Sequence, residues 1–135
     1  MSGQRRAELR SEPYLIDENT ANAYLAANPE RPGSRRLNIH NDPQAARKAG
    51  YQAPIIAGEH TWAFLAGFLA DRYGERFIHG GRLEASFIKP LLFGESIRAF
   101  ARELGPSGDC VELEVWVEND RGQKVAIGAA RVRAG

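Results

Sequence analysis

One apolar segment in the middle of the chain, residues 58–73, restricts the possible folds more than any other feature. Its apolar side chains would fall on nearly every side of a helix, so a helix here has to be buried rather than half in water. The segment is shorter than the ~20 apolar residues that cross a bilayer. The rest of the chain must therefore enclose this helix. Its large apolar residues are Trp62, Phe64, Leu65, Phe68 and Leu69.

After Gly81 the apolar period changes from that of a helix to that of strands. Apolar and polar residues alternate in residues 82–87, 96–102 and 111–118, and the last stretch is the clearest strand. An antiparallel sheet whose apolar face covers the helix satisfies both patterns. The sequence therefore predicts an α+β fold with one sheet wrapped around one helix.

Turns and a last strand complete the predicted sheet. Residues 105–108 and 119–122 have the composition of turns, and the second leads into a strand from Lys124 to about Arg133. Such a sheet has open edges, and an open edge invites pairing with another strand. We expect a homodimer or a higher homo-oligomer that continues the sheet.

Short elements are expected before the apolar helix. Residues 13–16 favour a short strand, and Asp17 can cap a short helix that follows it. Residues 28–36 contain prolines, a glycine and three arginines and predict a loop. Asp42 followed by Pro43 predicts the N-cap and the first turn of another helix.

Size and composition fit one domain over residues 13–135, preceded by a mobile N-terminus of residues 1–12. A net charge of +1 gives no strong field, so neither nucleic acid nor a membrane is expected as a partner. The single cysteine, Cys110, excludes an intrachain disulfide and fits the cytoplasm. The three histidines lack ligand spacing, so no metal is expected, and no bound redox cofactor is expected either.

Two stretches of the chain carry a family pattern. The first leads into the apolar helix and reads His40-Asn41-Asp42, Gly50-Tyr51, Pro54-Ile55-Ile56 and Gly58. The second lies between two predicted strands and reads Ser86-Phe87-Ile88-Lys89-Pro90-Leu91-Leu92-Phe93-Gly94-Glu95-Ser96-Ile97. Together they resemble the MaoC-like hydratase and dehydratase family. The resemblance covers roughly residues 13–133 and implies the hotdog fold, an antiparallel sheet wrapped around a long buried central helix.

The resemblance implies catalytic residues that this chain keeps only in part. In the family an aspartate lies five residues before the histidine, and a second His-Gly pair starts the central helix. Here Arg35 replaces that aspartate and an Ala-Gly pair replaces His-Gly, so only His40 and Gly58 carry over by position. Two carboxylates are candidate substitutes: Glu59, directly after Gly58, and Glu30, in the preceding loop.

Addition of water to an enoyl thioester needs a base, an acid and a donor for the thioester oxygen. His40 can act as base or acid, because histidine titrates near the working pH. The Gly58 N–H at a helix start can be the donor, since no side chain blocks close approach. With Gly58, the predicted substrate-binding residues are His60, Asp42 and Arg82. Each of these three residues also has a purely structural explanation. His60 can be a hydrogen-bonded polar group at the start of the helix, Asp42 can be an N-cap, and Arg82 can lie on a solvated strand face.

Three functions stay open on the sequence alone. The first is a hydratase or dehydratase that uses His40 with Glu59 or Glu30. The second is a thioesterase on the same fold with Glu59 as its carboxylate. The third is a module that binds a small molecule, or converts it in another reaction, without lyase activity. For the first two the partner is a small-molecule acyl thioester, and coenzyme A or an acyl carrier protein is part of the substrate rather than a cofactor.

Overall fold

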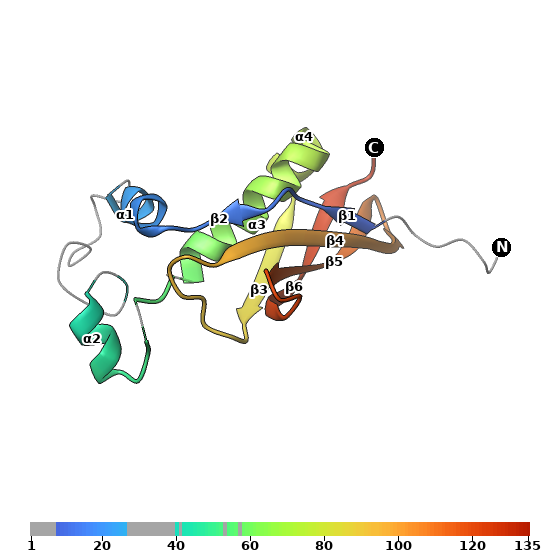
Figure 1. Ribbon diagram of the computed structural model, residues 1–135. Helices are drawn as coiled ribbons and strands as arrows, with labels where there is room; N and C mark the ends of the chain where they lie inside the picture. Colours follow the sequence, from blue (N-terminus) through green and yellow to red (C-terminus); the bar gives the residue numbers. More distant parts are fainter. Residues whose placement is uncertain (1–7, 27–39, 41, 53, 57) are drawn as a thin grey trace.

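The computed structural model describes residues 8–26, 40, 42–52, 54–56 and 58–135 (Figure 1). The helices in these residues are α1 (Glu18–Ala26), α2 (Pro43–Lys48), α3 (Gly58–Tyr73) and α4 (Glu75–Ile78). The strands are β1 (Glu8–Arg10), β2 (Tyr14–Leu15), β3 (Arg82–Phe87), β4 (Ser96–Ser107), β5 (Cys110–Asn119) and β6 (Lys124–Arg133). No helix among them is long and apolar enough to cross a bilayer.

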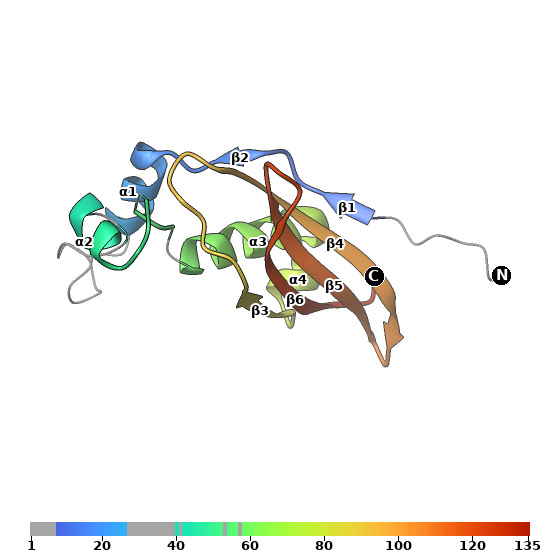
Figure 2. The same cartoon turned by 60° about the horizontal axis from the view of Figure 1, so that its bottom comes forward.

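The described strands form one antiparallel sheet in the order β1-β4-β5-β6-β3, and β2 pairs with the first residues of β4. The sheet curves around α3, as Figures 1 and 2 show from two directions. The arrangement predicted from the apolar segment and the alternating strands, a sheet wrapped around one central helix, is therefore confirmed.

The core lies between α3 and the inner face of the sheet. Leu113, Val115 and Val117 alternate on β5 and are at most 1% exposed, in one apolar cluster with Leu65 and Leu69 of α3. Each such side chain contributes about 1.5–3 kcal/mol when it is taken from water. The inward-facing apolar side chains of β5 and the apolar side chains of α3 therefore bury each other, which stabilises both elements.

Three local predictions hold in detail. Asp17 accepts a hydrogen bond from the Thr20 N–H at 2.8 Å, at the start of α1. Asp42 caps α2 and accepts from two backbone N–H groups of its first turn. The turn predicted at residues 119–122 joins β5 to β6, and β6 ends at Arg133 as expected. Capping and turn chemistry are local, so the sequence determines them.

The central helix is less completely enclosed than predicted. Trp62 is 41% exposed, so the expectation that it belongs to the core is wrong, whereas Phe68 is 6% exposed. The sheet lies along one side of α3 (Figures 1 and 2), and Tyr14 and Tyr24, from β2 and α1, pack against His60 in its first turn. A helix that is apolar on all sides thus keeps an open side among the described residues.

The sheet differs from its prediction at three places. β1 lies within the segment expected to be mobile and pairs with β4, with Leu9 opposite Ala101. β4 continues to Ser107 through a register shift after Glu103, so the strand passes the turn expected at residues 105–108. Phe87 was expected to face inward with its alternating neighbours, but it is 50% exposed. Phe87 ends the edge strand β3, where the facing residue of α3 is a glycine and offers no side chain to cover the ring.

Candidate active site

His40 is held by a backbone carbonyl. Its Nδ1 lies 3.0 Å from the carbonyl oxygen of Ile55, and the ring is partly buried. A carbonyl oxygen only accepts, so Nδ1 must donate and carry the proton in this arrangement. In the neutral ring the basic nitrogen is then Nε2. The imidazole therefore has a defined tautomer although the family's aspartate is missing from its position.

His40 lines a pocket of about 330 Å³ at the N-terminal end of α3. The lining is mostly apolar, which makes polar interactions inside it stronger than in water. His40, Thr61 and Lys89 add a few polar groups, the usual composition of a small-molecule site. The apolar lining residues are Ile55, Ile56, Phe87, Ile88, Pro90, Leu91 and Val125.

Gly58 is the first residue of α3 and lines the same pocket. A Cβ at this position would lie 2.9 Å from the ring of Phe87, closer than real contacts allow unless the ring moves. The first N–H groups of a helix have no partner within the helix and carry a positive partial charge. The structure thus brings His40 and Gly58, the two positions shared with the family pattern, to one pocket.

His60 lies outside this pocket, in an aromatic cluster of Tyr14, Tyr24, His60 and Phe64. It is 5% exposed, its Nε2 is 2.9 Å from the Tyr14 hydroxyl, and Tyr24 stacks on the ring at 4.3 Å. Burial lowers the pKa of His60, so the ring is neutral near pH 7. These contacts join α1 and β2 to α3.

The other predicted residues do not meet in the pocket lining. Glu59 is exposed on the first turn of α3, and Asp42 is the α2 cap with its nearest bonds to backbone N–H groups. Arg82 is exposed on the outer side of β3, 3.8 Å from Glu84. Glu30 lies outside the described residues. The roles assigned to these four residues stay predictions.

Most pocket residues were not singled out from the sequence. Phe87 to Leu91 belong to the second stretch that resembles the family, and Tyr51 and Ile55 belong to the first, so the pattern itself was the available signal. Val125 gave no signal, because only the pairing of β6 with β3 brings it to the pocket. In the described part of the chain no three histidine, cysteine, aspartate or glutamate residues gather as metal ligands would.

A larger hollow of about 480 Å³ lies on the outer face of the sheet, over Trp116 and Ile127. Its lining contains neither His40 nor Gly58. The smaller pocket is the better candidate of the two, because its lining contains a titratable ring and a helix N-terminus.

Sequence and structure comparisons agree with this geometry. The family model for a MaoC-like domain matches residues 37–132 of the chain, which include His40, Gly58 and all of β3 to β5. No sequence among the curated proteins searched matches the chain.

Several solved structures have the same fold. An (R)-hydratase from A. caviae involved in PHA biosynthesis is 17% identical, with a TM-score of 0.75 over 99% of this chain and 98% of that chain. A MaoC-like dehydratase from Rhodospirillum rubrum is 21% identical, with a TM-score of 0.72 over 98% of this chain and 93% of that one. A (3R)-hydroxyacyl-ACP dehydratase complex from Mycobacterium tuberculosis is 17% identical, with a TM-score of 0.69 over 95% and 96%. The hotdog fold is thereby established for this chain.

Proposed function

Because the chain belongs to the MaoC-like dehydratase family, a family of hydro-lyases, we propose that it adds water to, or removes it from, an acyl thioester at the pocket of His40. The observation that carries the proposal is the His40 ring, held with its proton on Nδ1 in an apolar pocket beside the first turn of α3. The substrate is a 2-enoyl or 3-hydroxyacyl thioester. No cofactor is needed beyond the carrier thiol that is part of the substrate.

In the hydration direction the imidazole acts first as base and then as acid. His40 Nε2 takes a proton from water while the water oxygen bonds to the β-carbon, and the double-bond electrons move onto the thioester oxygen. The Gly58 N–H at the start of α3 stabilises the resulting enolate. The imidazolium then gives its proton to the α-carbon, which restores the carbonyl and leaves a 3-hydroxyacyl thioester. Dehydration follows the same steps in reverse.

The pocket also fits a carrier-bound substrate. Its apolar part suits a short acyl chain, and Lys89 at its exposed rim is the cation suited to a phosphate of coenzyme A or of a carrier protein. A role for Glu59 in thioester hydrolysis has less support, since Glu59 is exposed and lies outside the pocket lining. The hydro-lyase is therefore preferred to the thioesterase.

We further propose that the chain works as a cytoplasmic homodimer. β3 is one of the two edge strands of the described sheet, and Phe87 at its end and Ile88 directly after it are 50% and 54% exposed. An antiparallel pair of β3 strands centred on Leu83 would place Arg82 of one copy opposite Glu84 of the other, a favourable cross-strand pair. Light scattering of the purified protein should give twice the mass of the chain.

A direct assay tests the proposed activity. Purified protein with crotonyl-coenzyme A, or with a longer 2-enoyl thioester, should lower the absorbance of the conjugated double bond without releasing thiol. Thiol release with saturated acyl-coenzyme A would instead favour the thioesterase. A folded protein that converts no enoyl thioester of either carrier would refute the proposal.

A further inference from the structure

The Ile55 carbonyl that holds His40 belongs to a short ladder between two loop segments. Residues 54–56 precede α3, and residues 91–93 lie between β3 and β4. The Ile56 N–H donates to the Leu91 carbonyl at 2.7 Å, and the Phe93 N–H donates to the Pro54 carbonyl at 3.2 Å. Between these two bonds Ile55 lies opposite Leu92 in an antiparallel bridge.

The geometry of this bridge turns two backbone groups outward. Ile55 and Leu92 form a pair without hydrogen bonds between them, because the bonds flank the pair on both sides. In such a pair the N–H and C=O of each residue point away from the other strand. The Ile55 carbonyl thus points to His40, and the Leu92 N–H points to the opposite side of the ladder.

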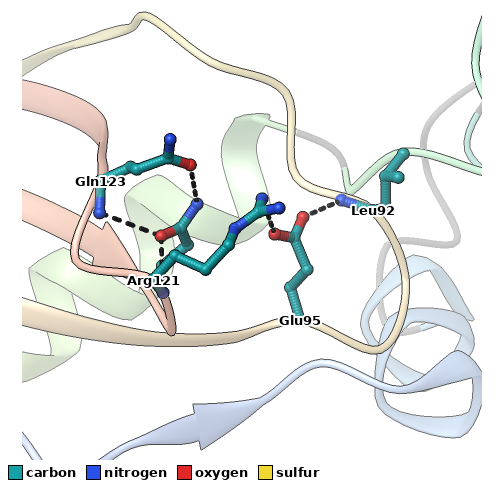
Figure 3. Close-up of polar contacts among 5 residues, drawn as sticks. Leu92, Glu95, Arg121 and Gln123 are labelled. Atoms are coloured by element: carbon teal, nitrogen blue, oxygen red, sulfur yellow. Dashed lines mark hydrogen bonds and ion pairs between the residues drawn. The ribbon is translucent and has the colours of Figure 1, made fainter.

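On that opposite side the carboxylate of Glu95 holds the ladder (Figure 3). Its Oε2 accepts the Leu92 N–H at 2.7 Å, and its Oε1 lies 3.2 Å from Nη2 of Arg121. The Glu95 side chain is only 18% exposed, which favours its bond to the Leu92 N–H, whereas the Arg121 side chain is 63% exposed and its ion pair is screened by water. A charged acceptor makes a shorter and stronger bond to a backbone N–H than a neutral one.

The backbone of Arg121 is held by the turn between β5 and β6. The side-chain oxygen of Asn119 accepts the N–H groups of Arg121 and Gln123, both at 3.0 Å, and its amide donates to the Gln123 side chain at 3.1 Å. Asn119 is 6% exposed. The arginine side chain that pairs with Glu95 therefore extends from a turn that three side-chain hydrogen bonds of Asn119 hold together.

We propose that Glu95, clamped by Arg121, is a positioning residue for His40. Glu95 fixes Leu92, Leu92 and its neighbours fix Ile55, and the Ile55 carbonyl fixes the tautomer and direction of the imidazole. This path orients His40 from the sheet in a chain that has Arg35, not an aspartate, five residues before the histidine. Its catalytic meaning rests on the proposed function, but the structural coupling from Glu95 to His40 does not.

Two graded substitutions of Glu95 test the coupling. Glu95→Ala removes both bonds, and Glu95→Gln keeps an acceptor for Leu92 while it loses the charge. In ¹⁵N spectra of the histidine rings, wild-type His40 should show the Nδ1–H form, and the share of the Nε2–H form should rise in the order wild type, Glu95→Gln, Glu95→Ala. The rate constant kcat for hydration should fall in the same order, by about tenfold for Glu95→Ala, with KM changed less than about twofold.

Matched variants separate positioning from a general loss of stability. Arg121→Lys keeps the charge and should retain the wild-type His40 signal, whereas Arg121→Ala, a change at an exposed side chain, should shift it even if Glu95→Ala does not fold. Glu112→Gln breaks a comparable arginine pair with Arg131 on the outer face of the sheet and should leave both His40 and kcat unchanged.

The outcomes keep the two proposals apart. Unchanged His40 ring signals in folded Glu95→Ala and Arg121→Ala would overturn the positioning role, whatever the activity. Shifted His40 signals together with no hydration by any variant or by wild type would support the positioning role and reject the proposed function.

Discussion

Two histidines near the start of α3 occupy opposite kinds of surroundings. His40 is partly buried at a pocket, and the acceptor of its Nδ1 proton is a backbone carbonyl. His60 is 5% exposed, stacked on Tyr24 and bonded to the Tyr14 hydroxyl. His40 therefore has a defined tautomer and faces a pocket large enough for a substrate. His60 is an uncharged part of the buried interior.

The difference shows why the type of residue alone does not identify a catalytic group. An acid–base catalyst must change its charge in the presence of substrate, which requires room for the substrate and a partner that tolerates both forms. A carbonyl beside His40 accepts from the neutral ring and from the imidazolium alike. The aromatic cluster around His60 disfavours the charged form by burial.

The largest expected effect is the loss of activity on replacing His40. We expect His40→Gln to lower kcat/KM for enoyl-thioester hydration by about 10²- to 10⁴-fold, because the only proposed base is removed. The melting temperature should stay close to that of wild type, since His40 is only partly buried. His79→Gln is the matched control, because His79 is exposed near the far end of α3 and should leave the rate unchanged. Equal rates in both variants would contradict the assignment.

Replacement of His60 should affect stability instead of chemistry. We expect His60→Ala to lower the free energy of unfolding by about 2–4 kcal/mol, because a buried ring and its hydrogen bond are lost. His60→Phe keeps a ring against Tyr24 but leaves the Tyr14 hydroxyl without its hydrogen-bond partner on α3, at a cost of about 1–2 kcal/mol. Urea unfolding measures both values. A fully stable His60→Ala protein that has lost turnover would reverse the comparison between the two histidines.

The two histidines also show which features of the structure can be predicted from the sequence and which cannot. The sequence predicted α3, β5 and the caps at Asp17 and Asp42, because hydrophobic period and capping chemistry act over a few residues. The partners of His60 are not local, since Tyr14 lies 46 positions away along the chain. No pattern within a short window indicates such a contact.

The candidate site was predictable to a similar extent. His40 and Gly58 followed from the family pattern, but the residues that surround them depend on how β3 and β6 pack beside α3. The exposure of Trp62 and Phe87 was missed for the same reason, because it depends on how far the sheet reaches around the helix. Glu59 was a candidate because it follows Gly58 directly in the sequence. Glu95 was not, because it is linked to His40 only through its hydrogen bond to Leu92 and the ladder that pairs Leu92 with Ile55.

A smaller effect is expected at Gly58, on the pocket side of the helix start. Gly58→Ala should lower kcat/KM by about tenfold, because the added methyl group pushes the Phe87 ring toward the substrate. Stability should change by less than about 1 kcal/mol, since alanine favours the helix and the half-exposed ring can move. The double variant with Phe87→Ala should recover most of the rate. A double variant as slow as Gly58→Ala would show that the methyl group itself blocks the Gly58 N–H.

The smallest expected effect is a pH dependence of stability that comes from His60. Its pKa in the folded protein lies below 6.5 because the ring is buried. Below about pH 6.5 the unfolded chain therefore binds a proton at this residue that the folded chain does not bind. The contribution of the neutral ring is fully present above that pH and is lost as the pH falls toward the folded-state pKa.

The His60→Phe variant isolates this contribution. The two proteins differ only at residue 60, so the contributions of all other residues to the pH dependence cancel when the two unfolding free energies are subtracted. We expect the advantage of wild type over His60→Phe to shrink between about pH 7.5 and about pH 5. A constant difference across this range would mean that His60 takes up its proton equally in both states. The aromatic cluster would then tolerate the charge, and the distinction between the two histidines would rest on the pocket alone.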